Sequence, residues 1–190
     1  PFGYPKAFVE FISNWDIKNP KPPEKDIFRF RNTERIVKRE CDATPLSTGA
    51  DKIALSVREW FLTLKKIEGG KPFERIDFGE RERTGNPIIE VYPKAALLQL
   101  EFNITGYKKK DNEGLSKRKE ISKCLFKRFR IKETDEINED DNTFDAFIAA
   151  ITGLIYLGKI EGHQIRRPNS EEEKKNARDE GWIFFPGNEG

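Results

Sequence analysis

Three carboxylates in this sequence lie within or beside apolar stretches. Glu90 interrupts the apolar run at residues 88–92, while Asp141 and Asp145 stand at the start of the apolar segment 144–155. Asp141 and Asp145 are four residues apart, which in a helix places them one turn apart on the same face. Mg²⁺ and Mn²⁺ prefer oxygen ligands. The three side chains are therefore candidate metal ligands and candidate catalytic residues.

A structural role for the acids near residue 141 is the alternative. Asp, Asn and Thr are favoured at helix starts, where an acid also interacts well with the helix dipole. On this interpretation Asp141 or Thr143 caps the helix, which is predicted to run from about residue 143 to 157. Asp145 is the sharper metal candidate, because it lies inside the first turn among apolar neighbours, where a lone carboxylate is costly to bury.

The segment 144–155 predicts a buried helix, because its apolar residues cover nearly all of its faces. Its small residues, from Ala146 to Gly153, predict a surface on which a sheet packs closely. The best predicted strand covers residues 88–92 and is stopped by Pro93. Further helices are predicted at 5–15, 33–39, 51–66, 94–102 and 115–129, with a charged helix or loop at 171–180 and a strand or apolar tail at 181–186.

Charge is balanced overall but unevenly distributed. The net charge is +2, yet residues 107–130 carry ten Lys or Arg against three acids, and residues 133–145 carry seven acids and no base. The basic helix predicted at 115–129 is either a solvated surface or a track for phosphates. The candidate nucleic-acid contacts are Arg29, Arg31, Lys108 and Arg118.

Cysteine and histidine usage excludes several classes of protein. Two Cys and one His make neither a disulfide framework nor a zinc set, which argues against zinc hydrolases and His-dependent nucleases. The sequence shows no signal peptide and no membrane span, so a reducing, cytoplasmic location is expected. Because the chain contains no Met, even at position 1, we expect it to be a fragment or processed product that lacks its N-terminal part.

Several segments resemble one family in their order along the chain. They are PFGYPKAFVEFI, FRFRNTERIV, TPLSTGADKIALSVR, IEVYPKAALLQL, a YK pair followed by Arg118, NTFDAFIAAITGL and GWIFFP. Together they resemble the domain-of-unknown-function family 429, a set of predicted nucleases with a ribonuclease H-like fold. The resemblance covers nearly the whole chain.

The resemblance implies a single α/β domain over residues 1–190, with a ribonuclease H-like mixed sheet flanked by helices. Glu90 and Asp145 match the family's acids. Asp141 matches less directly, because the family's preceding acid falls at the place of Asn142. Further family acids, on a first strand and just before PFG, lie outside this chain. The resemblance thus implies a site completed by an N-terminal segment or by a second polypeptide, and a chain that is inactive as it stands.

The implied activity is hydrolysis of phosphodiester bonds in DNA or RNA by a two-metal mechanism with Mg²⁺ or Mn²⁺. Two ions about 4 Å apart activate the attacking water and stabilise the pentavalent phosphate, which requires carboxylates from different elements. Glu90 and Asp145, far apart in sequence, are such a pair. The alternatives are a non-catalytic nucleic-acid-binding or interaction module, and a fragment completed by another polypeptide. No membrane partner is expected.

Overall fold

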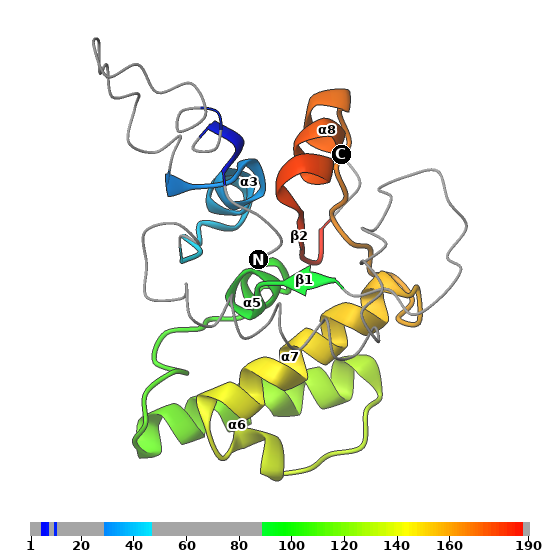
Figure 1. Ribbon diagram of the computed structural model, residues 1–190. Coiled ribbons are helices and arrows are strands. Elements are labelled where there is room, and N and C mark those ends of the chain that lie inside the picture. The colour runs from blue at the N-terminus through cyan, green and yellow to red at the C-terminus, as the bar shows by residue number, and fades with distance from the viewer. Residues whose placement is uncertain (1–4, 8–9, 11–28, 47–88, 188–190) are drawn as a thin grey trace, which may run out of the picture. The chain divides into compact units, whose positions relative to one another are not determined.

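The computed structural model describes residues 5–7, 10, 29–46 and 89–187 of the chain (Figure 1). Within these ranges the protein is a mixed α/β structure with five α-helices, one 3₁₀ helix and two short paired strands. The helix predicted at 51–66 lies outside the described residues, as does most of the one predicted at 5–15. The chain divides into two compact units, one of residues 1–90 with 167–183 and one of residues 91–166 with 184–190.

The first unit contains helices α3 (Asn32–Cys41) and α8 (Glu171–Glu180), which pack against each other. Helix α8 begins where the Ser170 hydroxyl accepts a hydrogen bond from the Glu173 N–H, and it ends at Gly181, whose φ of 85° suits glycine. Both helices match their predicted positions to within a few residues. The buried apolar residues of this unit include Ile36, Val37 and Cys41 on α3, Ala177 on α8 and Trp182 just beyond α8.

The second unit contains α5 (Pro93–Gln99), α6 (Asn112–Phe129), the 3₁₀ helix η1 (Glu136–Asn138) and α7 (Asp141–Tyr156). Pro93, which stops the preceding strand, is also the first residue of α5, a position that needs no N–H. Helix α6 is capped by Asp111, whose carboxylate accepts from the Gly114 N–H. Its Phe126 ring lies 5.5 Å from the Phe147 ring of α7, so the two helices pack through aromatic side chains.

Helix α7 has one buried face rather than a fully buried surface. Phe144, Ile148, Ile151 and Ile155 follow helical spacing and are at most 3% exposed. On other faces Ala146 and Ala150 are exposed and Leu154 is 39% exposed. The prediction of a helix buried all round is therefore wrong. An added Cβ at Gly153 would meet no atom within 4 Å, so this small residue does not serve close packing.

The N-cap of α7 is Asp140, so the prediction that Asp141 or Thr143 caps this helix is wrong. The Asp140 carboxylate accepts hydrogen bonds from the backbone N–H groups of Asn142 and Thr143, at 2.8 and 2.9 Å, and from the Thr143 hydroxyl. These bonds hold the Asp140 pKa below its ordinary value. The carboxylate of Asp141 therefore does not serve as the cap.

The strands β1 (Glu90–Val91) and β2 (Ile183–Phe184) form a parallel pair. The centre of the strand predicted at 88–92 is confirmed, although its two residues are half-buried rather than buried. After β2, Pro186 bridges to Ile165 in antiparallel orientation, and the Arg166 N–H donates to the Phe185 carbonyl at 2.9 Å. Since the described residues contain no further strand, the ribonuclease H-like mixed sheet stays a prediction.

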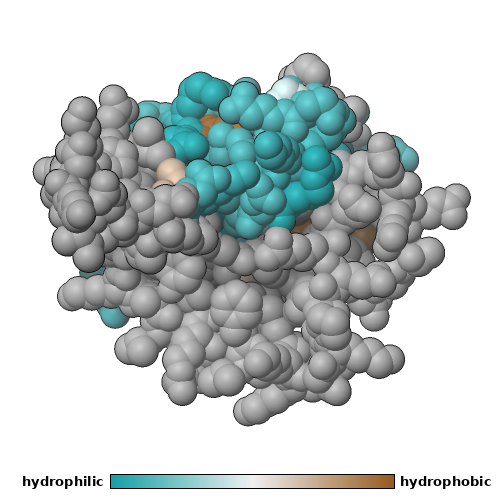
Figure 2. All heavy atoms as spheres, turned by 45° about the horizontal axis from the view of Figure 1, so that its top comes forward, coloured by the Kyte–Doolittle hydropathy of each residue, from teal (hydrophilic) through white to brown (hydrophobic). Residues whose placement is uncertain are grey.

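The described surface is largely hydrophilic in the view of Figure 2, which brings the top of Figure 1 forward. Helix α8 contributes exposed charged residues of both signs, among them Glu171, Glu172, Lys175 and Arg178. A search of the described helices found none that is both long enough and apolar enough to cross a membrane.

Candidate functional site

Glu90, a candidate metal ligand, is paired with Arg31. The Arg31 Nη1 and Nη2 atoms donate to the two Glu90 carboxylate oxygens at 3.0 and 2.7 Å. The Arg31 side chain is 1% exposed and that of Glu90 is 16% exposed. A bidentate arrangement of this kind is the strongest form of carboxylate–guanidinium contact. The Glu90 carboxylate is thus held in a mostly buried ion pair.

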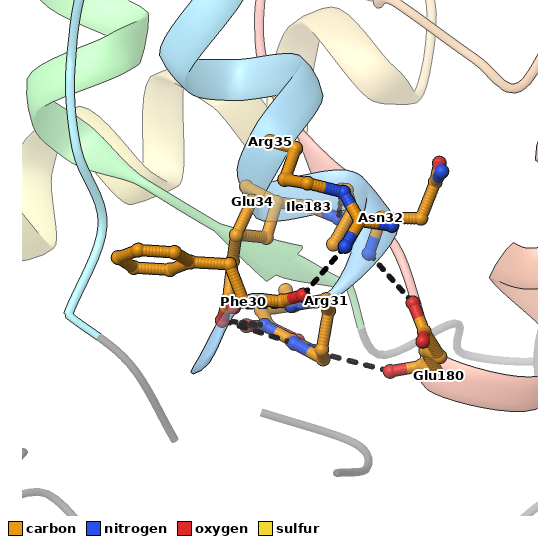
Figure 3. Close-up of polar contacts among 9 residues, drawn as sticks. Phe30, Arg31, Asn32, Glu34, Arg35, Glu180 and Ile183 are labelled. Carbon is orange, nitrogen blue, oxygen red and sulfur yellow. Dashed lines mark hydrogen bonds and ion pairs between the residues drawn. The ribbon is translucent and has the colours of Figure 1, made fainter. Parts of the chain in front are cut away.

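The same arginine gathers two further acids around it (Figure 3). Its Nε donates to one carboxylate oxygen of Glu34 at 3.0 Å, and its backbone N–H donates to the other at 2.8 Å. Its Nη1 also donates to the backbone carbonyl of Glu180, and the Glu180 carboxylate accepts from the backbone N–H groups of Asn32 and Lys6, both at 2.6 Å. We call Arg31, Glu34, Glu90 and Glu180 the Arg31 cluster. It ties the start of α3 to the end of α8.

Electrostatics keep Arg31 charged within this cluster. Burial opposes the charge, but the Glu90 and Glu34 carboxylates outweigh burial and raise the Arg31 pKa above its ordinary value. Burial raises the pKa of Glu34 more than the neighbouring Arg31 lowers it. Every side-chain nitrogen of Arg31 already contacts a carboxylate, so its predicted contact with phosphate does not fit this position. Arg29 is exposed, with its guanidinium 5.0 Å from the centre of the Phe30 ring, and its predicted phosphate contact is untested.

Asp145 lies in a more open environment, between a tyrosine and a lysine. The Tyr107 hydroxyl donates to Asp145 Oδ1 at 3.2 Å, and the Lys108 ammonium donates to Oδ2 at 2.7 Å. The Asp145 side chain is 22% exposed and that of Lys108 is 53% exposed. The Lys108 ammonium also lies 5.6 Å from the centre of the Tyr107 ring. We call Tyr107, Lys108 and Asp145 the Asp145 cluster.

Tyr107 is the fixed part of the Asp145 cluster. It is 3% exposed, and its ring packs against that of Phe144 at 5.8 Å. Burial first, then the charge and hydrogen bond of Asp145, raise the Tyr107 pKa above its ordinary value, and the charge of Asp141 adds to this shift. The phenol therefore stays protonated at neutral pH and remains a donor to Asp145. Asp145 is the acid that accepts the hydrogen bond of this hydroxyl.

Arg118 joins the two segments that meet in the Asp145 cluster. Its Nη1 donates to the carbonyls of Tyr107 and Lys109 at 2.8 and 3.1 Å, and its Nε donates to the carbonyl of Asn138 at 2.9 Å. The same loop packs tightly on α6 at Gly114, where an added Cβ would lie 2.0 Å from the Lys109 carbonyl oxygen. The guanidinium thus holds the loop that carries Lys108 against the segment that leads into α7.

This position does not fit the predicted phosphate contact of Arg118, because the residue is 3% exposed and bonded to carbonyls. For Lys108 the predicted phosphate contact remains a prediction that fits its position, since its side chain is half exposed. Along α6, Lys117 pairs with Glu120, whereas Lys123 and Lys127 are exposed one turn apart. The basic helix therefore offers fewer outward cations than its sequence suggests.

Comparison with protein families decides the affiliation of the chain. A family described as a protein of unknown function, DUF429, matches residues 29–173, a range that includes both clusters except Glu180. The chain belongs to the DUF429 family. The resemblance noted in the sequence is thereby confirmed at the level of the family. No curated protein and no solved structure matches the chain.

The candidate metal site on α7 of this DUF429 protein has few donors among the described residues. Mg²⁺ is often bound through only one or two carboxylates, with water and substrate phosphate as its other ligands. Asp141 and Asp145 supply two carboxylates one turn apart, and Asp140 rather than Asp141 caps the helix. In the described ranges, no three His, Cys, Asp or Glu side chains form a metal-binding group. Glu90 falls in the other unit, so an ion shared between Glu90 and Asp145 stays a prediction.

Sequence reasoning missed the partners of the candidate acids. The YK pair, Tyr107 and Lys108, is visible in the sequence, but nothing local links it to Asp145. Lys108 and Asp145 are 37 residues apart along the chain. For Arg118 the sequence did contain a signal of burial. Arg118 precedes the buried Ile121 and Leu125 by three and seven residues, so it lies on their face of α6. Glu34 follows Arg31, the N-cap of α3, by three residues, which is the spacing of a capping box.

Proposed function

We propose that this DUF429 protein is a metal-dependent nuclease, with a ribonuclease H-like fold, that hydrolyses phosphodiester bonds of DNA or RNA. One observation carries the proposal. Asp141 and Asp145 stand four residues apart at the start of α7, while Asp140 serves as the helix cap and the Tyr107 hydroxyl donates to Oδ1 of Asp145. The family match supports it only through the resemblance of this chain to predicted nucleases.

The carboxylates of Asp141 and Asp145 are the proposed ligands of Mg²⁺ or Mn²⁺. A divalent ion held there supplies Lewis-acid stabilisation of the charge that develops on a phosphate and lowers the pKa of a bound water. Tyr107 orients the Asp145 carboxylate by donating to Oδ1, and its raised pKa suits a donor rather than a base. Lys108 supplies a positive charge at the exposed side of the same carboxylate, where a substrate phosphate would approach.

Glu90 belongs to the two-metal form of the proposal. As a ligand of a second ion, Glu90 would have to give up its bidentate pairing with Arg31. Breaking one side of a mostly buried ion pair is costly. Asp141 and Asp145 are therefore the principal proposed ligands. The role of Glu90 as a ligand of a second ion has to be tested by substitution.

The decisive assay is cleavage of labelled single- and double-stranded DNA and RNA with Mg²⁺, with Mn²⁺ and with a chelator. It uses the protein together with any sequence that its reading frame places before Pro1. We expect Asp145→Asn and Asp141→Asn to abolish chelator-sensitive cleavage without unfolding the protein. Asp135→Asn removes an exposed acid whose carboxylate lies 3.7 Å from the Lys119 ammonium of α6, and this matched control should leave cleavage unchanged.

Cleavage that persists in Asp145→Asn, or that ignores the chelator, contradicts the proposal. The alternative of binding without cleavage is favoured by the two exposed lysines of α6, Lys123 and Lys127. It predicts nucleic-acid binding that weakens steeply with salt and is indifferent to the chelator and to Asp145→Asn.

A further inference from the structure

The ion pair between Lys108 and Asp145 differs in exposure and geometry from the other carboxylate pair of the candidate site. The Lys108 ammonium contacts a single oxygen, Oδ2, and more than half of its side chain is exposed. Ion pairs at exposed positions contribute little to stability, because water and salt screen them and long side chains lose freedom in forming them. This pair can therefore open at small cost.

The groups around this contact are nevertheless held in place by hydrogen bonds. The loop that carries Lys108 is held on both sides by the Arg118 guanidinium, which bonds the carbonyls of Tyr107 and Lys109. The other Asp145 oxygen is held by the buried Tyr107 hydroxyl. When the ammonium leaves Oδ2, both the carboxylate and the lysine backbone thus keep their places. The face of the Tyr107 ring, 5.6 Å away, is a second position that attracts the ammonium.

Resting on the proposed function, we propose that Lys108 is an exchangeable counter-ion of Asp145, which leaves the carboxylate when a divalent cation binds there and then contacts the phosphate of the substrate. An ammonium and a divalent cation cannot both occupy Oδ2, because their charges repel at contact distance. Lysine suits such an exchange, since its ammonium is a compact charge on a flexible stem, unlike the planar fork of an arginine.

The exchange assigns Lys108 two effects of opposite sign. In the absence of substrate the ammonium competes with the metal ion, so it lowers the metal affinity of the site. In the presence of substrate the displaced ammonium attracts a phosphate oxygen, so it raises the affinity for nucleic acid. The general effect of a positive charge near Asp145 is measured by removing the adjacent Lys109, and a lysine that only stabilised the fold would not affect the two affinities in opposite directions.

The test is Mn²⁺ binding by isothermal titration calorimetry to the wild type, Lys108→Gln, Lys109→Gln and Asp145→Asn. Lys109 is the matched control, because it is adjacent and equally exposed but its ammonium pairs with Glu113. We expect Lys108→Gln to bind Mn²⁺ about three- to tenfold more tightly than the wild type, as removal of a weak competing ion pair predicts. Lys109→Gln should match the wild type, and Asp145→Asn should lose binding.

A second readout is binding of a fluorescent single-stranded oligonucleotide in the presence of saturating Mn²⁺. Lys108→Gln should bind it several-fold more weakly than Lys109→Gln does. If Asp145→Asn loses Mn²⁺ while Lys108→Gln binds it like the wild type, the exchange is wrong and the proposed metal site stands. If Asp145→Asn binds Mn²⁺ like the wild type, or no variant binds it at millimolar concentration, both proposals are wrong.

Discussion

The Arg31 cluster and the Asp145 cluster each pair a candidate catalytic acid with a cation, but they do so under different physical conditions. Glu90 contacts the guanidinium of Arg31, a side chain that is 1% exposed, through both of its oxygens, whereas Asp145 contacts the ammonium of Lys108, a side chain that is 53% exposed, through one. A buried bidentate pair is costly to break, while an exposed single contact is easily exchanged. The difference indicates that the Arg31 cluster contributes more to stability and that the acid of the Asp145 cluster is the more accessible of the two.

Each region contains a buried arginine that the sequence suggested as a phosphate contact, and the side-chain nitrogens of each are hydrogen-bonded to other parts of the chain. Arg31 is neutralised by carboxylates, while Arg118 is bonded to backbone carbonyls and leaves the charge of Asp145 to Lys108. The acid that lacks a buried guanidinium partner is thus the one whose charge remains accessible.

The largest expected effect comes from removing the cation of the first cluster. Arg31→Met should lower the free energy of unfolding by about 3–5 kcal/mol, because it leaves the buried Glu34 and the mostly buried Glu90 carboxylates without their counter-ion. Chemical denaturation measures the loss. Arg39→Met, at an exposed position on the same helix, should change stability by less than about 0.5 kcal/mol. A similar small loss for Arg31→Met would contradict the structural role of the cluster.

The next effect concerns the arginine that supports the Asp145 cluster. Arg118→Lys should lower the free energy of unfolding by about 2–4 kcal/mol, because a single ammonium cannot reach the carbonyls of both joined segments and leaves buried acceptors unpaired. Denaturation of this variant is compared with Arg130→Lys, which makes the same change at an exposed position beyond α6. If Arg118→Lys proves harmless to stability yet weakens binding to nucleic acid, Arg118 is a phosphate contact after all.

A smaller effect on the free energy of unfolding should distinguish Glu90 from Asp145. Glu90→Gln should lower the free energy of unfolding by about 1–2 kcal/mol by weakening charged hydrogen bonds to Arg31, while Asp145→Asn should cost less than about 1 kcal/mol. In the cleavage assay the order should reverse, with Asp145→Asn the more damaging. Equal losses of stability would remove the distinction between the clusters. Loss of cleavage in a fully stable Glu90→Gln would instead favour the two-metal form.

The smallest expected effect is the dependence of stability on pH that Asp140, the N-cap of α7, causes. Because Asp140 caps the helix, the Asp141 carboxylate is not needed for that role. The Asp140 pKa is held below its ordinary value of 3.8 by the Thr143 hydroxyl and by backbone N–H groups. A lowered native pKa stabilises the fold above the ordinary value, and this contribution disappears as the pH falls through the lowered value. Thermal unfolding between pH 7 and pH 2 should show the wild type slightly more stable than Asp140→Asn at neutral pH, and equal to it at the acid end.

Asn caps a helix nearly as well as Asp, so the variant isolates the charge. Glu133→Gln, an exposed change in the loop before η1, is the control for the general effect of removing one acid. A difference between the wild type and Asp140→Asn that persists unchanged at pH 2 would mean that the cap charge plays no part.

The sequence by itself determined the local elements of the described regions. Helical spacing predicted α6 and α7 to within a few residues of their ends, and Pro93 ended the strand where expected. It also determined the identity of the acids and the family. These features depend on neighbours within one or two turns, where the periodicity of apolar residues and the chemistry of caps act directly.

Only the tertiary structure decided which cation each acid meets, and therefore which acid remains accessible. The chain has 35 Lys or Arg and 33 Asp or Glu, so its composition allows a very large number of pairings. Arg31 reaches Glu90 across 59 residues and Lys108 reaches Asp145 across 37. Contacts over such separations are set by how helices and loops pack, and burial then determines the strength of each pair, because the cost of removing charges from water depends on that packing.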